Sequence, residues 1–277
     1  MKHTTHKAFT MVELIFVIII LGIVASIGSE IIAKTYESYI VQRAQYKATS
    51  KTELALTQIA NRLRYAIPGT IGFRADNNVA SVFHIITEGN TGNDTVLQWV
   101  GADGDSFEAI TTASRRPGWS GFCDIDAYAG GTNFPTPGSN TVLAKTIITN
   151  LGGNIASANI FFPHSTAAYG IADSAAGGEA FTLDAALPNG IQLYERYKFA
   201  WSSYALSVEG GDLFLYHHFT PDIGVPLAGS KHLLLKNVTN FRFKGSEGSL
   251  RIKICKKEQI GMDANSTIHA CKEKVIF

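Results

Sequence analysis

The chain has 277 residues, of which 45% are hydrophobic, and its 24 basic and 23 acidic side chains give a formal net charge of +1 at pH 7. This balance provides no field that would steer a polyanion, so charge does not indicate nucleic-acid binding. After an apolar N-terminal segment, more than two hundred residues remain, enough for one domain with its own core and a large insertion.

The N-terminal segment, residues 9–32, predicts a transmembrane helix. It reads FTMVELIFVIIILGIVASIGSEII, and no residue from Leu14 to Ser29 is charged. A helix needs about 20 such residues to cross a bilayer. Residues 1–8 are polar and carry Lys2 and Lys7 but no acid. We expect this short leader to stay in the cytoplasm and the bulk of the chain to face the periplasm or its equivalent.

Glu13 is the exception within this apolar segment. A lone carboxylate at membrane depth costs on the order of 2.5–3.5 kcal/mol, so a cation must lie close by. Removal of the leader would expose an α-amino group at the same depth on an adjacent subunit. The alternative is an ordinary secretory signal peptide cut near Ser26–Gly28, which Glu13 and the lack of an A-x-A site disfavour.

The order Lys7-Ala8 followed by Phe9-Thr10-Met11-Val12-Glu13-Leu14 resembles the class III signal of type IV pilins and type II secretion pseudopilins. The resemblance implies that a prepilin peptidase cuts between Ala8 and Phe9 and methylates the new amino group of Phe9. It also implies that Glu13 is the assembly carboxylate, which pairs with the N-terminus of a neighbouring subunit. The motif covers about the first tenth of the chain and departs from the family at Ala8, usually Gly, and at Glu30, which replaces the Pro of many major pilins.

Residues 33–67 predict an amphipathic continuation of the helix that ends at Pro68-Gly69. A helix from about Phe9 to about Ala66 would be roughly 85 Å long. Its buried face is predicted from residues that recur every three or four positions, which are Ala44, Ala48, Thr52, Ala55, Ile59, Leu63 and Ala66. The resemblance suggests that this face lies on an antiparallel sheet. A coiled-coil stalk is disfavoured because the small residues do not form a heptad of bulky ones.

From residue 68 to 277 the composition predicts a β-rich domain, and the fold class is therefore α+β: a long N-terminal helix packed on a C-terminal antiparallel β-rich head. Residues 79–86 and 94–100 predict strands joined by a turn at 88–93, and 101–105 predicts another turn. Residues 115–190 predict an irregular insertion of loops and short strands, with apolar islands at 142–148 and 160–162, rather than a second domain.

Two hairpins are predicted near the C-terminus. Residues 197–208 and 213–219 form the first around a turn at 209–212, and residues 238–245 and 249–256 form the second around 246–248. The residues of the second hairpin that should share the buried face are Phe241, Phe243, Leu250, Ile252 and Ile254, and those of the other face are Arg242, Lys244, Arg251 and Lys253. Residues 274–277 are expected to add an edge strand. This arrangement is similar in pattern to the C-terminal domains of the larger minor pilins and of J-type minor pseudopilins.

The three cysteines allow three pairings. A periplasmic location permits disulfides. We favour Cys255 with Cys271 because the polar segment between them has little apolar content to order itself, and closing that loop would stabilise by roughly 3 kcal/mol. Cys123 is then left over.

Several short patterns contain residue types that can carry chemistry. Asp103, Asp105 and Glu108 form a weak calcium candidate, but they lack the spacing of an EF-hand, and a turn is favoured. Residues 224–231, GVPLAGSK, imitate a Walker A motif, yet Ser230 precedes Lys231 instead of following it.

The remaining patterns do not form a catalytic set. Trp119-Ser120-Gly121 lacks the glycine spacing of a nucleophile elbow. His217 and His218 should point to opposite faces of a strand, which suits no shared metal. We therefore expect no enzyme activity, no metal and no cofactor.

The sequence thus predicts a minor pilin or minor pseudopilin of the inner membrane that enters a type IV pilus or a type II secretion pseudopilus at its tip or during initiation. The expected partners are prepilin peptidase, other pilin or pseudopilin subunits, the inner-membrane assembly platform and membrane lipid. The sequence does not distinguish between the two kinds of filament, because their subunits share the N-terminal motif. The alternatives are a membrane-tethered ligand-binding or adhesin protein and a periplasmic enzyme with an ordinary signal.

Overall fold

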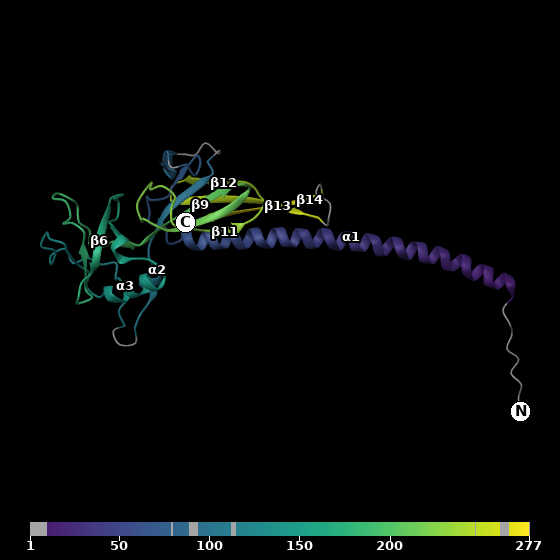
Figure 1. The fold of residues 1–277 in the computed structure, drawn as a ribbon, viewed down its shortest axis with the longest axis horizontal. Helices are drawn as coiled ribbons and strands as arrows, with labels where there is room; N and C mark the ends of the chain where they lie inside the picture. The colour runs from purple at the N-terminus through teal and green to yellow at the C-terminus, as the bar shows by residue number, and fades with distance from the viewer. Residues whose placement is uncertain are drawn as a thin grey trace, which may run out of the picture.

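The computed structural model describes residues 10–78, 80–88, 94–111, 115–246, 248–260 and 266–276. One long, gently curved helix carries a β-rich head on its C-terminal part (Figure 1). The helix, α1, runs from Met11 to Leu63 and has 53 residues. At 1.5 Å per residue it is about 80 Å long. The predicted α+β fold is confirmed.

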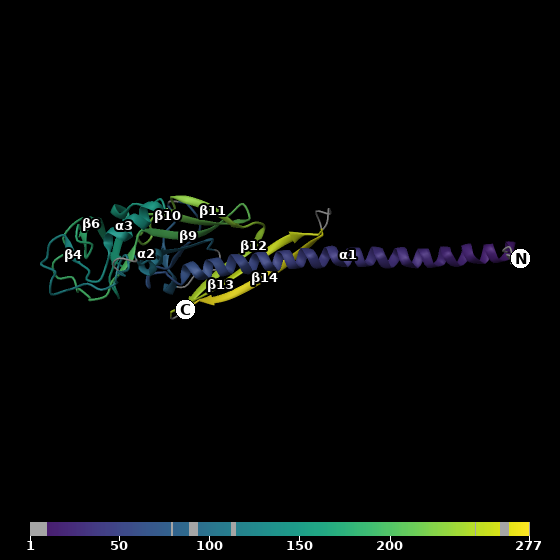
Figure 2. The same cartoon turned by 90° about the horizontal axis from the view of Figure 1, so that it is seen from below.

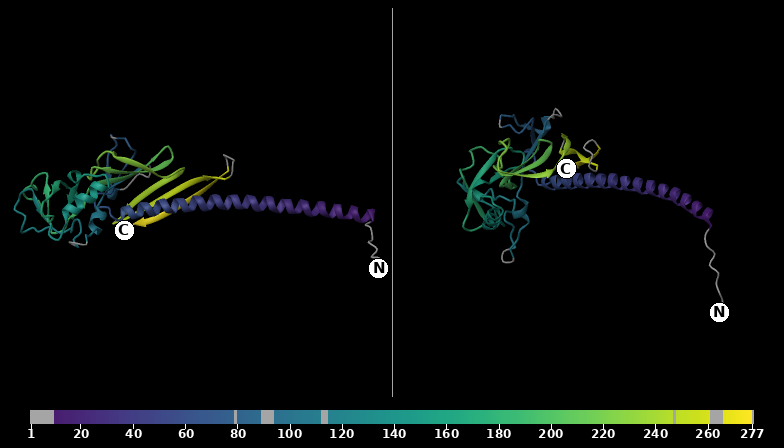
Figure 3. Two further views of the ribbon diagram at one scale, coloured as in Figure 1. Left: turned by 60° about the horizontal axis from the view of Figure 1, so that its bottom comes forward. Right: turned by 45° about the vertical axis from the view of Figure 1, so that its right-hand side comes forward.

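The part of the head nearest α1 contains two antiparallel sheets. The first has the order β11-β10-β9-β3-β1-β2. Its strands are β1 (Gly72–Arg74), β2 (His84–Ile85), β3 (Val96–Gly101), β9 (Ser202–Glu209), β10 (Asp212–Phe219) and β11 (Ser230–Leu235). The second has the order β12-β13-β14, with strands β12 (Val238–Ser246), β13 (Ser249–Gln259) and β14 (Thr267–Ile276). Figure 3 shows β13 and β14 lying along α1.

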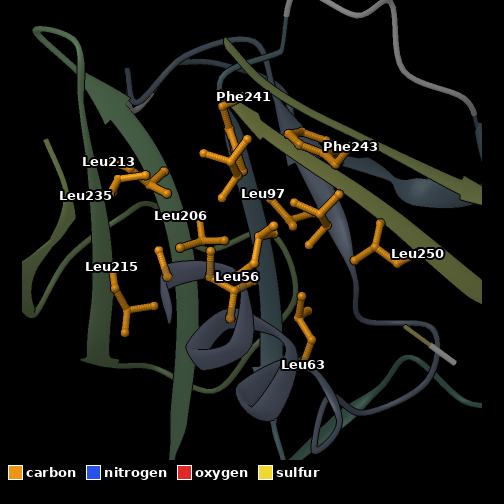
Figure 4. Packing of buried hydrophobic residues seen from close by; sticks show 14 of the residues in the cluster. Leu56, Leu63, Leu97, Leu206, Leu213, Leu215, Leu235, Phe241, Phe243 and Leu250 are labelled. Atoms are coloured by element: carbon orange, nitrogen blue, oxygen red, sulfur yellow. The ribbon is translucent and has the colours of Figure 1, made fainter. Parts of the chain in front are cut away.

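The C-terminal half of α1 packs where these two sheets meet. Its buried residues are Ala44, Ala48, Thr52, Ala55, Leu56, Ile59, Ala60 and Leu63. In Figure 4, Leu56 and Leu63 lie beside Leu97 and Leu206 of the first sheet and Leu250 of the second. The predicted amphipathic face is therefore confirmed from Ala44 to Leu63, whereas Ala66 lies beyond the end of the helix and is only partly buried. The small residues of this face, such as Ala44 and Ala48, lie toward the N-terminus, and the large ones, such as Leu56 and Leu63, contribute to the core.

The second predicted hairpin is confirmed in register and in orientation. Phe243 pairs with Ile252 and Phe241 with Ile254, and these side chains are buried in the core. Arg251 and Lys253 alternate with them on the exposed side. The edge strand predicted at residues 274–277 exists but is longer than expected: β14 already begins at Thr267.

The prediction for residues 79–86 was largely wrong. The strand there is only β2, and a short 3₁₀ helix, η1 (Ile86–Glu88), follows it. Val79 and residues 89–93 of the predicted turn lie outside the described residues. The strand predicted at 94–100 is confirmed as β3. The turn predicted at 101–105 instead leads into a short helix, α2 (Gly104–Glu108).

Residues 117–200 form a second packed body, which we name the distal unit. Its sheet has the order β4-β7-β6-β5-β8. The elements are β4 (Asn133–Pro135), α3 (Thr141–Asn150), η2 (Ile155–Ser157), β5 (Asn159–Phe161), β6 (Ala168–Ser174), β7 (Ala180–Leu183) and β8 (Lys198–Ala200).

The distal unit has a hydrophobic cluster of its own, which includes Trp119, Phe134, Phe181 and Phe199. It lies at the end of the molecule opposite the N-terminus of α1 (Figure 1). The sequence predicted its short strands but neither α3 nor the separate cluster. Trp201 is the one residue between β8 of the distal unit and β9 of the first sheet.

Candidate functional site

The N-terminal half of α1 is apolar, and no other described part of the chain covers it. Its large side chains, among them Met11, Leu14, Ile20 and Ile32, are all more than half exposed, and no residue of its most apolar stretch is buried. Figure 2 shows this half projecting beyond the head. By length and composition, the helix is able to cross a membrane once.

Glu13 lies in the first turn of α1 and takes part in a capping box with Thr10. The Thr10 hydroxyl accepts a hydrogen bond from the Glu13 N–H, and the Glu13 carboxylate accepts one from the Thr10 N–H, both at 3.4 Å. This pattern is typical of helix N-termini, where free N–H groups favour an acid. Ala8 and Phe9, the predicted processing residues, lie outside the described residues.

The other half of α1 is tied to the head by ion pairs. Lys47 contacts Glu258 of β13 at 2.8 Å, and Glu53 contacts Lys272 of β14 at 3.3 Å. Glu258 also pairs with Lys256, which is buried. These contacts add to the apolar packing and hold the exposed half in a defined direction from the head.

The predicted disulfide between Cys255 and Cys271 is present. The two residues lie directly opposite each other on β13 and β14, with their Cα atoms 4.0 Å apart. The segment between the two cysteines is more ordered than its composition predicts, since most of it continues the two strands to Gln259 and from Thr267. Burial raises the pKa of the remaining Cys123 thiol to about 12, which leaves it a poor nucleophile.

Two of the three carboxylates proposed for calcium have other partners. Asp103 is the N-cap of α2, and its carboxylate accepts the Ser106 N–H at 3.1 Å. Its burial raises its pKa to about 6. Glu108 accepts a hydrogen bond from the Tyr65 hydroxyl at 2.8 Å. Within the described part of the chain, no group of three or more His, Cys, Asp or Glu side chains has an arrangement that could hold a metal ion.

The prediction that His217 and His218 point to opposite faces was wrong. Their ring centroids lie 4.3 Å apart. The strand register shifts between Tyr216 and Phe219, and His218 has a φ of 60°, so β10 bulges at this point and turns both rings together. His232 of β11 stacks on His217 with centroids 4.8 Å apart. A bulge at a non-glycine residue leaves no clear signal in sequence.

The residues of Trp119-Ser120-Gly121 and of the Walker-like segment 224–231 have structural roles. The Ser120 hydroxyl accepts the Phe122 N–H at 3.3 Å and is 3.2 Å from the Thr136 hydroxyl. Lys231 lies in strand β11, where its ammonium pairs with Glu209 at 2.8 Å. A P-loop lysine belongs instead at the start of a helix.

Compared with known proteins, the chain matches no family model, no curated protein and no solved structure. Its function must therefore be argued from its own residues. The most informative of them are the exposed apolar half of α1, the carboxylate at its first turn and the head that holds its other half.

Proposed function

We propose that the chain is a minor pilin or minor pseudopilin, a structural subunit of a type IV pilus or a type II secretion pseudopilus. The observation that carries this proposal is that one unbroken helix is apolar and exposed in its first half and locked to a folded head in its second. So much exposed apolar surface needs lipid or other apolar helices around it. A subunit that waits in a membrane and then packs its helix into a filament meets both requirements in turn.

In this proposal the leader stays in the cytoplasm, α1 spans the inner membrane once, and the head lies in the periplasm. Lys2 and Lys7 on the short N-terminal side favour that orientation. The disulfide between Cys255 and Cys271 supports an oxidising compartment for the head.

Assembly depends on Glu13 and on cleavage between Ala8 and Phe9 by prepilin peptidase. The methylated amino group of Phe9 on one subunit then pairs with Glu13 on the next. Thr10 follows the cut, so the capping box is kept in the mature chain. Its hydrogen bonds do not neutralise the carboxylate, which still requires a cation in lipid. A subunit that fails to meet a neighbouring terminus keeps an unpaired charge there.

The size of the head favours a tip or initiation position over the shaft. The distal unit extends the head away from the N-terminus of α1 (Figure 2). A shaft repeats its subunit many times and favours a compact shape, whereas a subunit present in few copies can carry such an extension. The assembly platform of the inner membrane is the partner that would receive it.

The proposal is tested with two matched acid-to-amide variants, Glu13→Gln and Glu30→Gln. Glu30 pairs with Lys34 at 2.7 Å on an exposed turn near the end of the apolar segment. We expect both variants to be processed to a mature chain that begins at Phe9, as intact-mass analysis would measure. Only Glu13→Gln should lose copurification with other pilin-like subunits.

Equal copurification of the two variants would refute the role of Glu13. A native chain that keeps its first eight residues, or that begins beyond the apolar segment, would refute the whole proposal.

The distal unit favours a second candidate, a membrane-tethered ligand-binding or adhesin protein. This unit has its own core and stands at the end of the head farthest from the N-terminus of α1. Glycan-array binding by the full chain in detergent micelles, without any copurifying pilin-like protein, would support this candidate over the first.

A further inference from the structure

Three histidine rings gather at one edge of the first sheet, beside the C-terminal end of α1. His217 stacks on His232 with an interplanar angle of 12° and meets His218 edge-on at 88°. Arg62 of α1 is near enough that its positive charge lowers the pKa of both His217 and His218. The Arg62 guanidinium also lies over the Tyr204 ring, 5.5 Å from its centroid.

Close contacts hold the backbone around the three histidines in place. The His218 N–H donates to the Ser202 hydroxyl at 2.9 Å, and the His218 ring lies 4.9 Å from that of Trp201. Gly229 passes so close to the bulge that a Cβ there would lie 2.3 Å from the His217 carbonyl oxygen. Because Trp201 joins β8 to β9, the cluster touches the connection between the distal unit and the first sheet.

Among the described residues, the charges that act on this cluster are all cationic. His217 is faced by His218 and His232 on the strands and by Arg62 on the helix, and no carboxylate of the described part of the chain shifts the pKa of His217 or His218. Glu209 is paired with Lys231 and Tyr216, whose side chains take the other face of the strands. Asp105 and Glu108 line a cleft with Arg62 but do not shift the pKa of His217 or His218. Protonation therefore adds positive charge where no anion compensates it.

We propose that His217, His218 and His232 form an acid-sensitive latch, which holds β11 against β10 while the rings are neutral and releases it when they are protonated. The strand is suited to release. It is an edge strand, and of its six residues only Leu235 is buried. Its departure would expose the edge of β10, a surface that can pair with a strand of another chain.

The direction of the pH effect follows from the environment of His217. Burial first, and then the neighbouring cations, lower its pKa from 6.5 to about 4. The folded form therefore binds this proton less readily than the unfolded form. The stabilising effect is complete above about pH 6.5 and is lost as the pH falls toward about 4. The latch lies between the head and the C-terminal end of α1 and does not depend on filament assembly.

Hydrogen exchange of the full chain in detergent micelles would test the latch. We would compare a peptide covering β11 with one covering β13 at about pH 7.5 and about pH 4.5, after correction for the intrinsic exchange rate. We expect the protection of β11 to fall on the order of tenfold relative to β13 at the lower pH. The variant His217→Gln should abolish this difference, and His269→Gln, an exposed position on β14, should behave like the unmodified chain.

Equal protection of β11 at the two pH values would overturn the proposal, as would an unchanged loss in His217→Gln. A second measurement needs no variant. The ring resonances of His217 in the unmodified chain should titrate below about pH 5, and a midpoint above about pH 6 would equally overturn the latch.

Discussion

The carboxylate of Glu258, between β13 and α1, should contribute far more to stability than the exposed ion pairs of the same sheet. Lys256 is 2% exposed, and its ammonium pairs with Glu258 and donates to the Lys257 carbonyl at 3.2 Å. The other oxygen of Glu258 contacts Lys47 of α1 at 2.8 Å. The substitution Glu258→Gln keeps the side-chain shape but leaves the buried ammonium without an anion.

Breaking a buried pair in this way costs about 3–5 kcal/mol. For a folded unit of this size, each kcal/mol lowers Tm by about 2–4 °C, so we expect a fall of roughly 6–20 °C. The matched control is Glu273→Gln, which removes the partner of Arg251 from a pair whose side chains are 42% and 65% exposed. Such a pair contributes about 0–1 kcal/mol, and Tm should fall by no more than about 4 °C.

The assay is thermal unfolding of the full chain in detergent micelles, followed by near-ultraviolet circular dichroism. Burial alone raises the pKa of Glu258, but hydrogen bonds from Lys256 and Lys47 outweigh burial and bring it below its ordinary value of 4.5. The contribution of Glu258 is therefore present above pH 4.5 and is lost as the pH falls further. Unfolding of Glu258→Gln and Glu273→Gln within about 2 °C of each other at neutral pH would refute a large contribution of Glu258 to stability.

Three further changes test the core, the disulfide and the cap of α2. Ile59→Ala, at a residue 1% exposed, should destabilise by about 2–5 kcal/mol in urea unfolding, whereas Leu54→Ala on the exposed side of α1 should change little. Removing the Cys255–Cys271 disulfide by a double change to Ala should cost roughly 3 kcal/mol, and a reductant should then have no added effect on Tm. Asp103→Asn keeps the oxygen that caps α2 and removes a buried charge, so it should stabilise by up to about 3 kcal/mol above pH 6. That gain should disappear near pH 4, where Asp103 is itself protonated; a gain in Tm that is the same at both pH values would contradict this reasoning.

The elements that the sequence predicted well are those whose burial repeats at a local period. Ala48, Thr52 and Ile59 recur on one face of a helix, and Phe243 and Ile252 alternate along paired strands, so neighbouring residues alone reveal which side is buried. The disulfide was also correctly paired. Its cause, the direct opposition of two strands, only became visible with the register of β13 and β14.

The elements that sequence missed depend on distant contacts or on unusual backbone. The core of the distal unit joins Trp119 to Phe199, eighty residues later, through segments that read as loops because glycine and small polar residues crowd them. Asp103 was assigned to a turn, since the same residue types start turns and cap helices. For the candidate site, the apolar helix and Glu13 were evident from sequence, whereas the histidine cluster required the bulge at His218.

Protonation of Asp103 and protonation of His217 change the stability of the folded head in opposite directions over nearly the same pH interval. As the pH falls through about 6, protonation of buried Asp103 relieves a destabilising charge, so the folded state gains stability. Over the same interval His217 loses its stabilising neutral form. The two effects oppose each other in the Tm of the whole head. The Tm can therefore change little with pH even though two sites depend strongly on it. Asp103→Asn should therefore steepen the loss of stability in acid, and His217→Gln should reduce it.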